Sequence, residues 1–475
     1  MTQEDLLLEQ FARDVEAYLK AAYFIGKYYF SIHTGKERKD YGLLPEQQVP
    51  LEVQRQMQRE NLVPIFHEYI HYIHEISTPV GNVGLSLDLI KKSLFSNFFD
   101  PRKDSCESLG MTGELRDRYR YMNASKALLE GSKSVNTKIL KIELAGNLLQ
   151  DFQILSGDML ASRSIEIPIL TAKIHQNDRF EAVNLYFGKF FIYEGLAYEL
   201  DRELDRQLSG RSTIQDDMRF TEYTVLRLVA LKIYPSIDTK SFLTLASLSL
   251  AYINCGFVFI DLLHGLKKRV DAGERMEDIL EQFKQKVREL MLEQSDDFEG
   301  AQEEIIAIFA GRPQLLTAFQ YICGHAKATY TIRKTEPTFE VDLMFSGQFE
   351  TLLEKAPICD YMYQFADLDS YGRDFLGTSS MDNATSQACK VLISYSHYQE
   401  CHREFSTSKL ESRNIETPCP FFSCCTLQLR QDHAKICGSR PWRIFEVSAR
   451  TDQRYCWYGN GVMEFKGVTE PQIPI

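Results

Sequence analysis

The sequence predicts a mainly α-helical protein of the α+β class, with a large helical domain at residues 1–330 and a smaller mixed domain at residues 331–475. Before residue 330, apolar side chains recur mostly at spacings of three and four residues, which is the period of a helix with one buried face. After residue 330, alternating stretches and turn residues become frequent, and the chain is rich in cysteine and histidine from residue 389. A chain of 475 residues with 44% hydrophobic residues can bury a large core.

Charge and composition limit the function classes. The net charge of −12 and the pI near 5.5 argue against nucleic acid or an anionic membrane as the main partner. The first 20 residues are acidic and amphipathic and lack the basic segment of a signal peptide, so we expect a cytoplasmic protein. In that compartment the eleven cysteines are expected to be thiols or metal ligands, not disulfides.

The first part of the chain is expected to be helical with one strand. Apolar residues that would share one side of a helix predict a long amphipathic helix over residues 3–32. A second helix is predicted over residues 61–78, where Pro64 is tolerated in the first turn because its missing N–H costs nothing there. The helical period resumes over residues 137–162. The β-branched stretch Ile165–Leu170 predicts an edge strand that could pair with a peptide substrate.

Helices are expected to continue to the end of the first domain. Residues 190–206 also predict a helix, with aromatic residues at helical spacing. Ser241–Ile260 is uncharged over 20 residues but holds several polar side chains, so we expect a buried helix and no membrane span. Helical patterns follow at Glu277–Leu292 and Ala301–Phe309. The alternation over Thr329–Asp342 predicts a strand.

The helix at residues 61–78 contains the motif His67-Glu68-Tyr69-Ile70-His71. Residues four apart share a helix face, so His67 and His71 project side by side and can hold one zinc ion at about 2.0–2.1 Å each. Glu68 is then placed to take a proton from a metal-bound water. His74 shares the face but lies about 10 Å along the helix axis from His67, so it cannot bind the same ion. We expect it to support a ligand or to pack in the core.

Zinc needs a third protein ligand, and Glu194 is the best candidate. Apolar and aromatic side chains lie one and two turns before it and one turn after it, namely Phe187, Phe190, Phe191, Ala197 and Tyr198. A carboxylate on an apolar helix face is usually paired or bound to a metal, because burying it unpaired is costly. A buried ion pair is the alternative role for Glu194.

The motif at residues 67–71, together with Glu194-Gly195-Leu196-Ala197, resembles the zincin metallopeptidases, and among them the gluzincin branch. The resemblance implies that His67, His71 and Glu194 bind zinc and that Glu68 is the general base. The gap from His71 to Glu194 is 194 − 71 = 123 residues, longer than is usual in that branch. Tyr198 stands where some gluzincins carry an aspartate that orients a histidine, so it is a further candidate for a position beside the ligands.

The cysteine-rich tail offers a second, structural zinc site. Four residues have the residue types and the sequence spacing of a closed tetrahedral site: Cys419, Cys424, His433 and Cys437. Other cysteines and histidines could replace some of them: Cys425, Cys389, His397, Cys401, His402 and Cys456. Two alternatives remain open, namely buried thiols that pack as small apolar groups and a cysteine nucleophile with a histidine base.

These observations predict a zinc-dependent metallopeptidase that hydrolyses peptide bonds in protein or peptide substrates, with one catalytic zinc ion and no nucleic acid or membrane as its main partner. The alternative is a non-enzymatic interaction protein in which only the tail binds a structural zinc ion. Glu68 favours the enzyme, because a purely structural site has no use for a carboxylate at that position.

Overall fold

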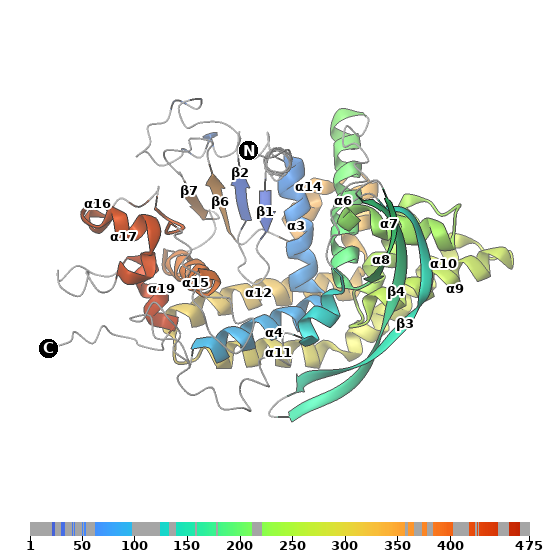
Figure 1. Ribbon diagram of the computed structural model, residues 1–475, viewed down its shortest axis with the longest axis horizontal. Coiled ribbons are helices and arrows are strands. Elements are labelled where there is room, and N and C mark those ends of the chain that lie inside the picture. The colour runs from blue at the N-terminus through green and yellow to red at the C-terminus, as the bar shows by residue number, and fades with distance from the viewer. Residues whose placement is uncertain are drawn as a thin grey trace.

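The protein is mainly α-helical with two small β-sheets, which confirms the predicted fold class (Figure 1). The computed structural model describes residues 21–23, 30–33, 40, 42, 50, 52–53, 62–96, 124–132, 139–156, 159–176, 179–210, 221–356, 360–364, 373–377, 383–401, 418–422, 425, 427–444 and 456–465.

The helices up to residue 271 are α3 (Leu62–Ser77), α4 (Pro79–Ser96), α6 (Lys189–Ser209), α7 (Thr221–Ile233), α8 (Thr239–Ser249) and α9 (Cys255–Asp271). The later helices are α10 (Met276–Glu293), α11 (Ser295–Ile308), α12 (Pro313–Thr335), α13 (Phe339–Phe345), α14 (Phe349–Lys355), α15 (Asn383–Cys401), α16 (Gln428–Asp432), α17 (Ala434–Ser439), the 3-10 helix η2 (Pro441–Arg443) and α19 (Trp457–Phe465). The strands are β1 (Ala21–Tyr23), β2 (Phe30–His33), β3 (Ile139–Ser156), β4 (Met159–Gln176), β5 (Arg179–Tyr186), β6 (Asp360–Gln364) and β7 (Arg373–Gly377).

Helix α3 lies at the centre of the fold, with α6 on one side and β1 and β2 on the other (Figure 1). It also packs against α12 and α4. Its residues from Ile65 to Ser77 are buried almost without a break, except His67, so this helix has core on nearly every side. The hydroxyl of Tyr69 donates to the carbonyl oxygens of Leu352 (2.9 Å) and Ala356 (2.6 Å), which ties α3 to the end of α14.

Helix α4 leaves the end of α3 at a tight junction. The Thr78 hydroxyl donates to the His74 carbonyl oxygen at 2.5 Å and accepts from the Gly81 N–H at 3.0 Å. A Cβ on Gly81 would lie 2.4 Å from the same carbonyl oxygen, so no larger residue fits without moving one of the helices. The junction therefore fixes the direction in which α3 ends.

The β3–β4–β5 sheet is antiparallel and occupies the stretch for which a helix had been predicted. The predicted helix over residues 137–162 is wrong, because its described residues form β3 and the start of β4. The expected strand Ile165–Leu170 lies in β4. Residues 165–168 pair with β3 alone, whereas Ile169 and Leu170 lie between β3 and β5, so the stretch is at an edge only over its first four residues. The long strands curve along one end of the molecule in Figure 1.

The second sheet has the order β1-β2-β6-β7 and joins distant parts of the chain. β2 pairs with β6 in parallel, from Phe30 opposite Tyr361 to His33 opposite Gln364. The predicted helix over residues 3–32 is wrong at β1 and at β2, and its other residues lie outside the described part of the chain.

Helices α8, α9 and α12 correct two further expectations. The predicted single helix Ser241–Ile260 is divided, since α8 ends at Ser249 and α9 begins at Cys255. In the described part of the chain, no helix is long and apolar enough to cross a membrane. The predicted strand Thr329–Asp342 is wrong, because it forms the end of α12 and the start of α13.

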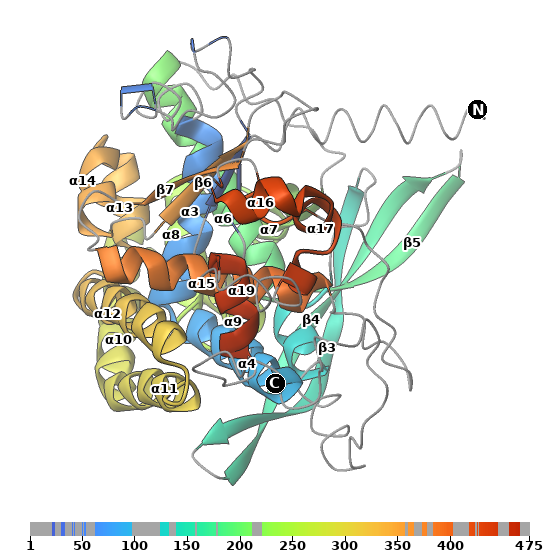
Figure 2. The same cartoon turned by 90° about the vertical axis from the view of Figure 1, so that its left-hand side faces the viewer.

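The predicted domain division at residues 330 and 331 falls inside α12, and the β2–β6 pairing joins residues from both sides of it. The division into two domains stays a prediction. Helices α16, α17 and α19 lie at the end of the molecule opposite the β3–β4 strands (Figure 1), and α19 packs against α15 (Figure 2).

Candidate metal centre

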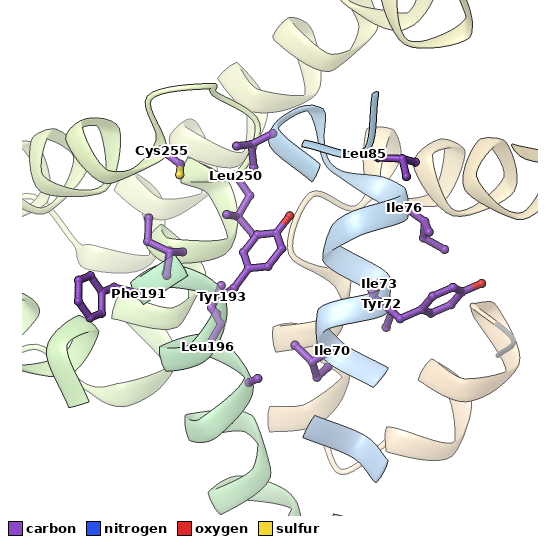
Figure 3. Close-up of a cluster of buried hydrophobic side chains, with 14 of the residues drawn as sticks. Ile70, Tyr72, Ile73, Ile76, Leu85, Phe191, Tyr193, Leu196, Leu250 and Cys255 are labelled. Carbon is purple, nitrogen blue, oxygen red and sulfur yellow. The ribbon is translucent and has the colours of Figure 1, made fainter. Parts of the chain in front are cut away.

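Helices α3 and α6 pack directly against each other and carry the predicted ligands on their facing sides. Figure 3 shows buried side chains on both helices, with Ile70, Tyr72, Ile73 and Ile76 on α3 and Phe191, Tyr193 and Leu196 on α6. Tyr72 and Ile76 lie on the side of α3 that points away from α6, so α3 is packed on both sides. In this packing, His67 and His71 of α3 come together with Glu194 of α6.

The three predicted ligands converge on one point. The Nε2 atoms of His67 and His71 lie 3.1 Å apart, and each lies 3.4 Å from Oε2 of Glu194. Ligand atoms held tetrahedrally at about 2.0–2.1 Å from one ion are about 3.3 Å apart, so the spacing fits a single metal ion. Two imidazole nitrogens and one carboxylate oxygen also form a donor set that transition metals accept. The group can therefore hold a metal ion.

Asp201 orients one of these ligands. Its Oδ2 lies 2.6 Å from Nδ1 of His67, the ring nitrogen that points away from the other two ligands. A carboxylate on Nδ1 holds the imidazole in the tautomer that leaves Nε2 open to a metal and makes that nitrogen more basic. The sequence analysis missed Asp201. It follows Glu194 by seven residues, which is two helical turns, and this spacing was the signal that could have found it.

The electrostatics of the group suit a cation. Burial by itself lowers the pKa of His67, but the charge and hydrogen bond of Asp201, with a hydrogen bond from Glu194, raise the pKa well above its usual value. Burial opposes ionisation of Glu194, yet His71 and His67 lower its pKa well below the usual range. Two carboxylates thus surround the imidazole pair, and positive charge is stabilised between them.

Glu68 lies next to the ligands in a largely buried position, with 8% of its surface exposed. Its charge contributes to the raised pKa of His67 and, after burial and two other carboxylates, to that of Tyr223. The Glu68 carboxylate is therefore close enough to the metal group for its charge to act on His67.

Tyr223 of α7 is a second neighbour that the sequence analysis missed. Its ring meets the His67 ring edge-on, with centroids 5.5 Å apart, and stacks on Tyr198 at 5.0 Å. Tyr198, the further candidate from the sequence, stacks on Tyr223, and Tyr223 in turn contacts the His67 ring. Nothing in the spacing of the sequence links Tyr223 to the site, because it comes from a different helix.

A glycine next to the ligand allows α7 to approach α6. A Cβ on Gly195 would lie 2.4 Å from the Cβ of Leu226, so the two helices can pack this closely only with glycine at that position. Arg227 of α7 also pairs with Glu199, which is buried on α6. The close α6–α7 contact brings Tyr223 to the edge of the metal group.

His74 lies in a separate buried network and does not reach the ion. Its Nε2 is 3.1 Å from Oε1 of Glu340, and both side chains are completely buried. Arg333 pairs with Glu340 at 3.1 Å and donates to the hydroxyl of Ser77 at 2.8 Å. Burial is the main cause that lowers the pKa of His74 to about 4, so His74 is neutral at neutral pH. It stabilises α3 and does not orient a ligand.

Two of the four tail residues predicted to bind a structural zinc ion lie together at a pocket. Cys419 and Cys437 line one pocket of about 190 Å³, but His433 is not among its lining residues, and Cys424 lies outside the described part of the chain. Cys425 and Cys456 line the same pocket. Of the other tail histidines, His397 lies 2.9 Å from the hydroxyl of Tyr458.

No protein-family model, curated protein or solved structure matches this chain. The function of the metal group must therefore be argued from its own residues.

Proposed function

We propose that the protein is a zinc-dependent metallopeptidase in which His67, His71 and Glu194 bind the ion. The observation that carries this proposal is the convergence of three donor atoms at 3.1–3.4 Å on one point, with Asp201 behind His67. Three protein ligands leave the fourth position of a tetrahedral zinc ion for water or substrate, as in catalytic sites, whereas structural sites have four.

A bound zinc ion would lower the pKa of its water to about 7 and polarise the carbonyl group of the peptide bond. Glu68 follows His67 in sequence and its charge acts on the His67 ring, so its carboxylate is suited to remove the proton from that water. The same carboxyl group then donates this proton to the amine that leaves. Asp201 keeps His67 in the binding tautomer throughout.

The developing negative charge on the substrate oxygen needs a hydrogen-bond donor, and Tyr223 is the best-placed phenol. Burial and the charges of Glu194, Glu222 and Glu68 raise the pKa of Tyr223 well above its usual value, so the hydroxyl keeps its proton. A protonated phenol at the edge of the site can stabilise an oxyanion. Glu194 keeps 20% of its side chain exposed, so the group is open to solvent on the side of α6.

The experiment that tests this function compares Glu68→Gln with wild type. Glutamine keeps the shape of the side chain but cannot accept the proton, so we expect unchanged zinc content and cleavage of an unfolded protein substrate slowed by about 10²–10⁴-fold. Glu277→Gln, an exposed change on α10, is the control and should cleave at the wild-type rate.

Two outcomes would count against the enzyme. If Glu68→Gln cleaves as fast as wild type, Glu68 is not the base. If wild type binds zinc at His67, His71 and Glu194 but cleaves no peptide bond in any unfolded protein, the site supports an interaction protein instead.

A further inference from the structure

Four cysteines that are far apart in sequence line one pocket in the C-terminal part of the chain. They precede or belong to short helices of this region: Cys419, Cys425, Cys437 and Cys456. The pocket has a volume of about 190 Å³. All four are free of disulfide bonds. We refer to them as the cysteine tetrad, and we propose that the tetrad binds a thiophilic metal centre through four thiolates.

Backbone hydrogen bonds hold the tetrad together and point at its sulfur atoms. The N–H of Cys419 donates to the carbonyl oxygen of Cys437 at 2.8 Å, which joins two of the cysteine loops. The N–H of Phe421 donates to Sγ of Cys419 at 3.4 Å, and the N–H of Gly459 donates to Sγ of Cys456 at 3.4 Å. Such donors stabilise sulfur in its negatively charged form, which is the form that binds metal.

Helix α19 adds a favourable dipole. Cys456 directly precedes the first residue of this nine-residue helix, so its sulfur lies at the positive end. Thiolates at helix N-termini are stabilised for this reason. Cys456 is also the ligand most distant in sequence, 19 residues after Cys437 (456 − 437), so metal binding would clip α19 to the α16–α17 segment.

The surroundings balance the charge of four thiolates. The Arg430 guanidinium donates to the carbonyl oxygen of Cys425 at 2.9 Å and lies over the Phe422 ring at 4.9 Å. Phe421 meets Trp457 edge-on at 5.3 Å and closes another side of the pocket. Four thiolates around a divalent ion carry a net charge of about −2, and a neighbouring arginine in an apolar wall compensates part of it.

The composition of the pocket favours metal binding over catalysis by a cysteine nucleophile. Among the residues that the structure describes, its lining includes no histidine, aspartate or glutamate, and so no general base for a cysteine nucleophile. A set of four sulfur donors without oxygen donors selects soft metals, in practice zinc or an iron–sulfur cluster.

The distances between the four sulfur atoms can be compared with those around a single zinc ion. Four sulfurs at about 2.3 Å from one zinc ion lie about 3.8 Å apart. No three sulfurs of the tetrad lie within 4.8 Å of one another, so a single zinc ion would draw them inwards. An iron–sulfur cluster is the other metal centre that four thiolates hold. The shared chemistry is ligation by four thiolates.

The experiment uses the full chain, purified without oxygen in the presence of a thiol reductant and carrying His71→Ala to remove the first metal site. We expect about one zinc ion, or iron with inorganic sulfide, to remain bound per chain. X-ray absorption at the edge of that metal should show only sulfur ligands. Zinc without sulfide identifies a single ion, whereas iron with sulfide and visible absorption identifies a cluster, and both support the proposal.

Matched variants test the ligand set. In the same background, Cys425→Ser and Cys456→Ser should lose the remaining metal. Cys323→Ala, at a buried free cysteine of α12, is the control and should keep it. The proposal is overturned if the His71→Ala protein holds neither metal after anaerobic reconstitution with zinc, or with iron and sulfide, or if absorption shows nitrogen or oxygen ligands.

Discussion

The two ring nitrogens of His67 perform different tasks in the metal group. Nε2 faces His71 and Glu194, and Nδ1 bonds to Asp201 at 2.6 Å. Because one nitrogen is held by a carboxylate, the lone pair of the other is directed at the metal position before any ion arrives. The group is therefore prepared for a cation by a residue that does not touch it.

Asp201→Asn should weaken zinc binding by about 10–100-fold, because an amide neither holds the correct tautomer as firmly nor increases the basicity of His67. Competition with a chromophoric chelator would measure the affinity. Asp261→Asn, an exposed change on α9, is the control and should bind zinc as wild type does. Equal zinc affinities for the two variants would show that Asp201 does not contribute to zinc binding.

Tyr223→Phe should lower kcat by about 10²–10³-fold while zinc content and KM stay close to wild type, because a missing oxyanion donor affects the transition state alone. Steady-state kinetics on one peptide would separate the two constants. Tyr198→Phe keeps the ring that stacks on Tyr223 and should retain full activity. A Tyr223→Phe enzyme with unchanged kcat would show that another group stabilises the oxyanion.

For single residues, the sequence predicts the members of the metal group where helical spacing or an unusual neighbourhood marks them. His67 and His71 share a face through the i, i+4 rule, and Glu194 stood out as a carboxylate among apolar neighbours. Asp201 lies on the same helix face as Glu194, two turns later, but this spacing alone does not show which histidine it contacts. Tyr223 could not be predicted, because its position depends on how α7 packs on α6.

At the scale of elements, β3 shows why a strand can imitate a helix in sequence. Ile139 and Ile142 are both buried although they are three residues apart, a spacing that predicts a helix face. The strand register shifts between Ile139 and Lys141 and again between Leu144 and Gly146. Each irregularity moves later side chains to the other face, so the alternation of period two is lost.

The end of α12 shows the opposite error. Thr329 and Thr331 alternate with apolar residues and favour a strand by their branched side chains. In the helix their hydroxyls donate to the carbonyl oxygens of His325 (2.9 Å) and Lys327 (2.8 Å), four residues back. These bonds satisfy the hydroxyls within the helix, and packing of the buried face overrides the local preference.

Gly195→Ala should disturb the metal group through the α6–α7 contact. The new Cβ would meet the Cβ of Leu226 at 2.4 Å, and because that atom cannot rotate away, the helices must separate. We expect lower zinc affinity and a loss of about 1–3 kcal/mol of stability, although alanine is a better helix former than glycine. Gly324→Ala on α12 has open space around its Cβ and should be neutral or stabilising. Chemical denaturation and zinc titration would compare the two variants, and equal behaviour would contradict the packing argument.

At the scale of the whole molecule, one buried network joins α3 to three later helices. His74 and Ser77 belong to α3, Ser247 to α8, Arg333 to α12 and Glu340 to α13. Burial opposes ionisation of Glu340, but the Arg333 guanidinium and His74 lower its pKa well below the usual range. The ion pair is therefore fully charged at neutral pH, and loss of either partner would leave a buried charge.

Acid should destabilise the protein through His74, which faces Glu340, Arg333 and His71. The unfolded chain binds a proton at His74 near pH 6.5, whereas the folded protein does so only near pH 4, so stability falls as pH drops through this window. Between about pH 7 and about pH 5 the loss from His74 is about 2 kcal/mol.

Urea unfolding of wild type and His74→Gln at both pH values would isolate this contribution. The variant should lack the His74 part of the pH dependence, although its stability at neutral pH falls as well. If wild type and variant lose equal stability between the two pH values, His74 does not titrate on unfolding as its burial requires.

The partners of α3 also determine when this helix can take its final form during synthesis. His74 and Glu340 are 266 residues apart, and Tyr69 bonds to Leu352, 283 residues later. At the usual rate of about 5–20 residues per second, the ribosome needs roughly 15–50 s to deliver Glu340 after His74. For that interval α3 lacks the buried partner of His74 and the hydrogen bonds of Tyr69. The metal ligands meet α6 much earlier in the chain, since Asp201 follows His67 by only 134 residues, so the group can assemble before the helix that carries its histidines is fully packed.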